Sequence, residues 1–211
     1  IPAQDKVIVE QPFFFEGFAK LFESSDLSQL QDYLAAHSLM SAAPYMSDDF
    51  YAAQFDFFST AMSGVTEQKA RWKRAMSVPN SILGEAVGQM YVKKYFPEEN
   101  KKKMLEIVGE LQKSLGEHIA NLEWMSEQTK AYAQNKLSNF TVKVGYPDKW
   151  KDYSSLNVDP EQSYYKNIVA ANTWYVADNL SKMGKATDKS EWGMTPQTVN
   201  AYYNPTTNEI C

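Results

Sequence analysis

The sequence predicts a mainly α-helical protein. In most segments, apolar side chains recur at intervals of three and four residues, which is typical of amphipathic helices. Glycine is scarce, with 9 residues in 211, and low glycine content favours helices because glycine has a high conformational entropy to lose. The 5 Trp, 13 Tyr and 11 Phe provide enough apolar area for a sizeable core.

Seven helices are predicted along the chain. They cover approximately residues 13–22, 27–43, 48–64, 66–95, 97–122, 126–137 and 161–184. Ser25 or Asp26 is placed to cap the second helix, and Ser126 to cap the sixth. Pro97 with Glu98 and Glu99 starts the fifth, because proline fits the first turn and acids there complement the helix dipole.

Three features inside these helices carry specific expectations. Pro79 is expected to interrupt the stretch 66–95, because proline cannot donate the helical hydrogen bond. The run Lys101–Lys103 is predicted to form a solvated face. An apolar stripe in the fifth helix is predicted to be buried, and four tryptophans are predicted to anchor packing. The stripe is Met104, Val108, Leu111, Leu115, Ile119 and Leu122, and the tryptophans are Trp72, Trp124, Trp174 and Trp192.

The remaining segments are extended or irregular. Residues 7–9 are β-branched and predict an extended lead-in or strand, and residues 141–144 alternate like a short strand. Turn-forming residues crowd positions 147–160, which indicates a loop. Residues 198–203 are again strand-like, and the turn residues at 204–208 suit the start of a hairpin.

Composition excludes several classes of function. A net charge of −5 argues against a broad nucleic-acid-binding surface. The single Cys excludes an internal disulfide and any cysteine-based metal cluster. No apolar run is long enough to span a membrane, and no signal peptide is visible. The first residue is Ile rather than Met, so we expect this chain to be a piece of a longer protein.

The residues do not supply a catalytic site of their own. A helical zinc-protease site needs two His at i and i+4 with a Glu as general base. The two histidines, His37 and His118, stand 81 positions apart and have no further ligand at useful spacing. A phosphate-binding glycine loop is also missing. From residue pattern alone, the chain is an acidic, helix-rich domain with neither catalytic nor metal-binding residues.

A set of short motifs nevertheless falls in a familiar order. It resembles the neprilysin and endothelin-converting-enzyme family of zinc metalloendopeptidases, over nearly the whole chain from Val7. The motifs are residues 71–74 (RWKR), 85–92 (EAVGQMYV), 95–96 (YF), 122–125 (LEWM), 145–147 (GYP), 191–192 (EW), 199–203 (VNAYY) and 208–210 (NEI).

The resemblance implies a two-lobed fold with a large central chamber. The outer lobe of such enzymes is helical and allows only small peptides into the chamber, while the other lobe holds zinc. Residues 1–158 then correspond to part of the outer lobe, and residues 159–211 to the start of the catalytic lobe. The expected fold class is therefore a mainly α, multi-helix outer lobe with a short β segment at the C-terminal end.

The same resemblance assigns a substrate-binding role to Asn200, Ala201 and Tyr202. In the family, this segment is an edge strand whose Asn side chain and Ala backbone hydrogen-bond the peptide. An extended peptide would add to it by β-augmentation. Tyr202 would form a pocket wall. The alternative for Asn200 is an ordinary turn residue at the end of a strand.

The family's His-Glu-x-x-His motif, third zinc ligand and transition-state His follow this segment and are not in the sequence. We therefore expect the 211-residue chain to bind no zinc and to be inactive alone. The parent would be a zinc-dependent endopeptidase acting on oligopeptides, in which a zinc-bound water activated by Glu attacks the scissile carbonyl. The expected partners are an oligopeptide and the missing C-terminal catalytic portion.

Three further expectations follow from the resemblance. The single Cys suggests a bacterial member, because animal members are rich in disulfides. The family suggests an extracytoplasmic location. Residues 186–211 are expected to be poorly packed or paired with another copy, since their partner strands would be missing. The competing interpretation is a non-catalytic helical binding module or a degenerate family member.

Overall fold

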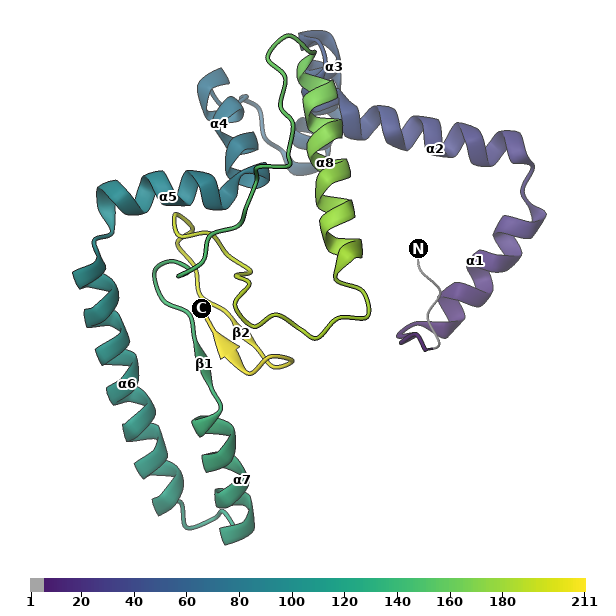
Figure 1. Cartoon of the computed structure of the whole chain (residues 1–211). Coiled ribbons are helices and arrows are strands. Elements are labelled where there is room, and N and C mark those ends of the chain that lie inside the picture. Colours follow the sequence, from purple (N-terminus) through teal and green to yellow (C-terminus); the bar gives the residue numbers. More distant parts are fainter. Residues whose placement is uncertain (1–5) are drawn as a thin grey trace. The chain divides into compact units, whose positions relative to one another are not determined.

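The computed structural model describes residues 6–211 and is mainly helical with one small sheet, as the sequence predicts (Figure 1). The helical elements are α1 (Pro12–Ser24), α2 (Leu27–Ala42), the 3₁₀ turn η1 (Ala43–Tyr45), α3 (Asp48–Gln54), the π-helical segment η2 (Phe55–Ala61), α4 (Arg71–Ile82), α5 (Gly84–Tyr95), α6 (Glu98–Asn121), α7 (Glu127–Ser138) and α8 (Tyr164–Ser181). The strands are β1 (Thr141–Val142), β2 (Tyr203–Asn204) and β3 (Glu209–Ile210).

The chain divides into two compact units that are interleaved in sequence. The first comprises Ile1–Arg71 and Leu156–Lys185, and the second comprises Trp72–Ser155 and Ala186–Cys211. The expected lobe boundary after residue 158 concerns the complete enzyme of the family and stays a prediction.

The first unit is organised around the contact of α8 with η1. The rings of Tyr45 and Tyr164 meet edge to face, with centroids 5.7 Å apart. Around them lie the most buried apolar side chains of the described residues, which are Ala42, Ala43, Phe55, Ile168 and Ala171. All five belong to this unit.

Helix starts in both units follow the predicted capping signals. Asp26 is the N-cap of α2, and its backbone N–H donates to the Oε1 of Gln29 at 3.2 Å. Ser126 caps α7, where its Oγ accepts from the backbone N–H of Thr129 at 3.2 Å. Both capping predictions are confirmed. Capping signals can be predicted from sequence because they depend only on residues within about three positions.

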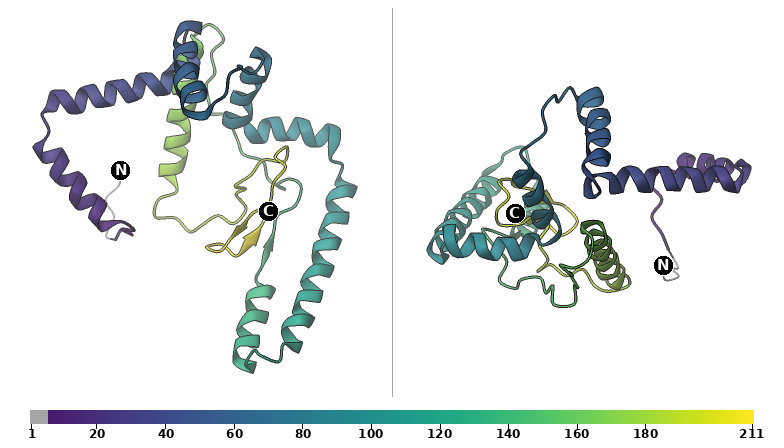
Figure 2. Two further views of the ribbon diagram at one scale, coloured as in Figure 1. Left: turned by 180° about the vertical axis from the view of Figure 1, so that it is seen from behind. Right: turned by 90° about the horizontal axis from the view of Figure 1, so that it is seen from above.

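In the second unit, α6 and α7 run side by side as a helical hairpin (Figures 1 and 2). The Gln134 side chain of α7 donates to the backbone carbonyl of Gly116 in α6 at 2.6 Å. No residue of α6 is fully buried, and Leu111 is 63% exposed. The expectation of a buried stripe is therefore wrong within this chain, because α7 is shorter than α6 and covers only part of it.

The sheet of the second unit has the order β1–β3–β2. β3 pairs in parallel with β1 and antiparallel with β2. The predicted hairpin at residues 204–208 is confirmed. The expectation that residues 186–211 lack a partner strand is wrong for β3, which pairs with β1 68 positions earlier and buries the Glu209 side chain there.

Two other expectations are corrected. The helical break lies at Leu83 rather than at Pro79, since α4 continues through Pro79 to Ile82. A proline removes one backbone donor but does not forbid the turns on either side. Trp72 and Trp124 are 65% and 76% exposed, so neither anchors packing in this chain. Within residues 6–211, none of the helices combines the length and hydrophobicity of a membrane-spanning segment.

Candidate substrate-binding edge

The segment Asn200–Tyr202 leads directly into β2. The backbone of Tyr202 exchanges two hydrogen bonds with that of Cys211, each 3.0 Å long. Antiparallel pairing therefore already begins at Tyr202, one residue before β2. The predicted site residues thus lie at the sheet and belong to the second unit.

One side of this strand is open. Because β2 is an edge strand, only its β3 side is paired among the described residues. Backbone groups of successive residues point to opposite sides of a strand, so those of Ala201 and Tyr203 face away from β3 while those of Tyr202 face it. The open edge is therefore formed by the backbones of Ala201 and Tyr203.

Asn200 is exposed at the start of this edge. Its Oδ1 accepts a hydrogen bond from the backbone N–H of Ala201 at 2.8 Å. This bond orients the side-chain amide along the strand and leaves the two N–H donors of Nδ2 for another acceptor. The backbone carbonyl of Ala201 is the matching acceptor on the same edge.

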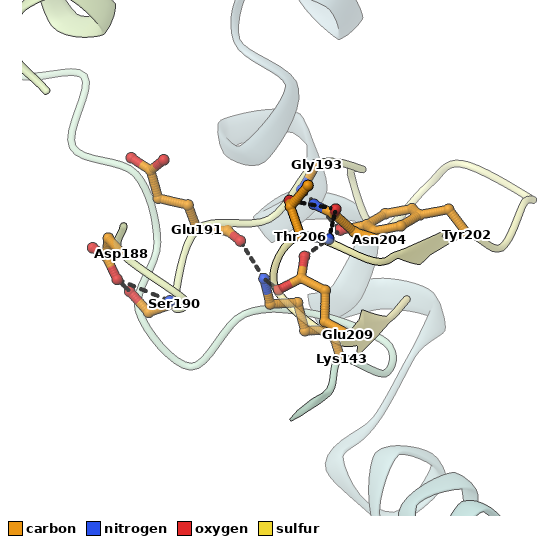
Figure 3. A network of polar contacts seen from close by, with 9 residues as sticks. All are labelled: Lys143, Asp188, Ser190, Glu191, Gly193, Tyr202, Asn204, Thr206 and Glu209. Carbon is orange, nitrogen blue, oxygen red and sulfur yellow. Dashed lines mark hydrogen bonds and ion pairs between the residues drawn. The ribbon is translucent and has the colours of Figure 1, made fainter. Parts of the chain in front are cut away.

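A buried ion pair between Lys143 and Glu209 lies next to Tyr202 (Figure 3). The Nζ of Lys143 lies 2.7 Å from the Oε2 of Glu209, and both side chains are 5% exposed. Lys143 also donates to the backbone carbonyl of Glu191 at 2.5 Å. These contacts join the residue after β1, the start of β3 and the segment before β2.

Tyr202 connects the edge strand to this ion pair. Its hydroxyl donates to the Oε1 of Glu209 at 3.2 Å and accepts from the backbone N–H of Gly193 at 3.3 Å. Burial raises the pKa of Tyr202, which keeps the hydroxyl protonated as a donor. Burial also works to raise the pKa of Glu209, but the hydrogen bond and charge of Lys143 outweigh it, so the pKa is lowered and the carboxylate stays ionised.

A second anchor holds the segment that precedes the edge. The side-chain amide of Gln197 donates to the Oδ1 of Asn80 at 3.1 Å and to the backbone carbonyl of Gly84 at 3.0 Å. Pro196 lies against α5, where a Cβ placed on Gly88 would stand 2.8 Å from its Cδ. The edge is therefore fixed on one side by α4 and α5 and on the other by the ion pair.

The part of the chain that the structure describes offers no set of ligands for a zinc ion. Among residues 6–211 there is no group of three or more His, Cys, Asp or Glu side chains that could hold a metal.

Neither Lys143 nor Glu209 is marked as a site residue by the sequence pattern. Each stands in a short strand-like segment, which is an unusual place for a charge that is not paired. That signal indicates a partner but does not identify it, because the two residues are 66 positions apart. Their pairing depends on the parallel register of β1 and β3.

Several known proteins are similar to this chain over nearly its whole length. The chain is 34% identical to a neutral endopeptidase of Lactobacillus helveticus, over 98% of this chain and 32% of that protein. It is 28% identical to human endothelin-converting enzyme 1, over 100% of this chain and 28% of the enzyme. A crystal structure of the Mycobacterium tuberculosis zinc metalloprotease Zmp1 with an inhibitor matches 97% of this chain and 30% of that one, with a TM-score of 0.87 and 36% identity.

The bacterial relative is an endopeptidase by name, and the solved structure is of a zinc metalloprotease, so the class is metallopeptidase. The description of peptidase family M13 matches residues 1–147, and the chain belongs to this family. The resemblance drawn from the motifs is thereby confirmed. The chain spans about a third or less of the length of these relatives.

Proposed function

We propose that this chain is part of a zinc-dependent endopeptidase that hydrolyses oligopeptides inside an enclosed chamber. Its membership of family M13 and the names of its relatives support this assignment. The chain would supply helical wall of the chamber and one strand that binds the substrate. By itself the 211-residue chain would be inactive.

The observation that carries the proposal is the open edge of β2. An extended peptide can pair with such an edge through its own backbone, while pockets beside the strand select its side chains. Ala201 would accept a hydrogen bond from a peptide N–H, and the Nδ2 of Asn200 would donate to a peptide carbonyl. Tyr202 would border a side-chain pocket.

Zinc would be held by residues outside this chain, and the missing catalytic portion would be its partner. The coding sequence after Cys211 tests this directly. A His-Glu-x-x-His motif in the same reading frame supports the proposal. Its absence would contradict the enzymatic assignment and leave a helical module that binds peptides or proteins without cleaving them.

Substitution of Asn200 tests the binding edge in the full-length protein. Asn200→Ala should lower kcat/KM by a factor that corresponds to about 1–3 kcal/mol of lost transition-state stabilisation, the scale of a substrate hydrogen bond lost in a buried site. The measurement is the cleavage of a fluorogenic oligopeptide at several concentrations. Asn157→Ala is the matched control, because Asn157 is exposed in a loop that is distant in sequence from Asn200. An unchanged kcat/KM for Asn200→Ala would remove this residue from the site.

We also propose that the enzyme acts outside the cytoplasm, as the family resemblance implies. Fractionation of cells that express the full-length protein checks this location. Recovery of the protein only with the cytoplasmic fraction would contradict it.

A further inference from the structure

The hydroxyl of Tyr202 is the side-chain link between the open edge of β2 and the buried pair Lys143–Glu209. We propose that these three residues form a positioning network that holds the edge strand in the place where it binds peptide. The inference rests on the proposed function and adds to it residues that touch no substrate. Tyr202 would then act through its hydroxyl as well as through its ring.

The register of the sheet explains why these side chains meet. Asn204 lies opposite Glu209 in the antiparallel pair, and side chains two residues apart share one face of a strand. Tyr202 is therefore on the same face as Glu209 and diagonal to it, within reach of a long aromatic side chain. The network follows from backbone pairing and needs no special loop geometry.

Burial and charge make the network a fixed point in the second unit. Lys143 and Glu209 are buried, with 5% and 4% of their surface exposed, and they are the only charged residues among those described that are so little exposed. A buried ion pair tolerates little movement, because separating the two charges leaves each without a partner. A strand that is hydrogen-bonded to this pair is therefore restrained in its position.

The edge strand is also held through Tyr203, whose ring stacks on that of Phe140 with centroids 6.0 Å apart, but this residue lies on the opposite face from Tyr202. β2 contains two residues, and its ladder to β3 is correspondingly short. Short edge strands fray, because each ladder bond lost removes a large share of their support. At 3.2 Å the bond from Tyr202 to Glu209 is long for a hydroxyl on a carboxylate. Its effect should therefore be on position and be modest in size.

Tyr202→Phe in the full-length protein tests the network, since it removes the hydroxyl and keeps the ring. We expect KM for an oligopeptide to rise about threefold to tenfold while kcat stays within about twofold, because peptide binding weakens and the chemical groups are untouched. A loss of folded enzyme would instead lower the apparent kcat and leave KM unchanged. Tyr132→Phe is the control, because this tyrosine is 68% exposed on α7 in the same unit.

Hydrogen exchange in the full-length protein gives a readout that needs no activity. The amides of Tyr202 and Cys211 bond each other's backbone carbonyls. In Tyr202→Phe these two amides should exchange several-fold faster at an unchanged midpoint of thermal unfolding. In Tyr132→Phe they should exchange at the unaltered rate.

The outcomes separate this inference from the function on which it rests. If Asn200→Ala lowers kcat/KM but Tyr202→Phe changes neither KM nor exchange, the positioning network is wrong and the proposed binding edge stands. If Asn200→Ala has no effect, the proposed binding edge is wrong, and the network's role in peptide binding is overturned with it. A rise in KM for Tyr202→Phe together with faster exchange supports the network.

Discussion

At the scale of the residue, the pair Lys143–Glu209 has an asymmetric energetic role. Both charges lose their hydration, and their attraction does little more than offset that cost. Removing one partner is different, because the other charge then stays buried with no compensation. The pair therefore contributes more to the specificity of the sheet's arrangement than to its net stability.

Lys143→Met should lower the free energy of unfolding by about 3–5 kcal/mol, because it leaves the Glu209 carboxylate unpaired. Lys143→Met combined with Glu209→Leu should recover most of this loss, since no charge is then buried. Urea unfolding of the 211-residue chain followed by tryptophan fluorescence measures both. A double variant as unstable as the single one would contradict this account.

The lysine run at 101–103 shows how far single residues could be predicted. Lys102 and Lys103 form exposed ion pairs with Glu98 and Glu99 one turn earlier, as a solvated face requires. The Lys101 side chain is only 14% exposed and lies 2.7 Å from Asp148. Its prediction as solvated is wrong, because its partner is distant in sequence and no local pattern reports it. The pairing of Lys143 with Glu209 escaped prediction for the same reason.

At the scale of the element, α5 matters because a loop lies directly against it. A Cβ on Gly88 would also approach the Cγ of Pro196 and the Oε1 of Gln197 at 3.1 Å each. Pro196 is a rigid ring and cannot turn aside as a flexible side chain would. The close approach of the loop therefore depends on the missing side chain of Gly88.

Gly88→Ala should destabilise the chain by about 1 kcal/mol, because overpacking against Pro196 exceeds the gain in helix propensity. Gly109→Ala is the matched variant, since Gly109 lies within α6 and a Cβ there meets nothing within 4 Å. It should stabilise by about 0.5–1 kcal/mol. Thermal unfolding of both variants checks the signs, and equal shifts would refute the proposed close packing.

Helix ends could be predicted and helix partners could not. The starts of α2 and α7 follow from Asp26 and Ser126, whose signals act within one turn. The stripe on α6 has helical spacing, which correctly gives the helix. Its burial depends on what packs against it, and Met104 and Leu115 remain 42% and 51% exposed. The proposed binding edge at Asn200–Tyr202 comes from the motif resemblance and stays a prediction, whereas the pair Lys143–Glu209 behind it could be found only from the fold.

At the scale of the whole molecule, a large apolar surface is exposed. Helix α1 carries apolar side chains that are between 52% and 84% exposed, which are Phe13, Phe14, Phe15, Phe18, Leu21 and Phe22. Contiguous apolar area of this kind marks contact surfaces. Under the proposed function, the rest of the enzyme would cover part of it.

The 211-residue chain should therefore bind a hydrophobic dye such as ANS several-fold more strongly than the full-length protein at equal molar concentration. Dye fluorescence measured near neutral pH compares the two. Phe14→Ser with Phe18→Ser on α1 should reduce the signal of the chain, because their rings stack 6.0 Å apart on this helix. Equal fluorescence of the chain and the full-length protein would argue that the remainder covers none of this surface.

The strand order β1–β3–β2 has a consequence for biosynthesis. The central strand, β3, leaves the ribosome after both of its neighbours, so β1 waits unpaired while the intervening residues are translated. Pairings this distant in sequence form slowly, since a long loop must close first. A nascent chain that stops before Glu209 has no central strand on which β2 can dock. Under the proposed function, the peptide-binding edge would thus form only once Glu209 and Ile210 have been translated.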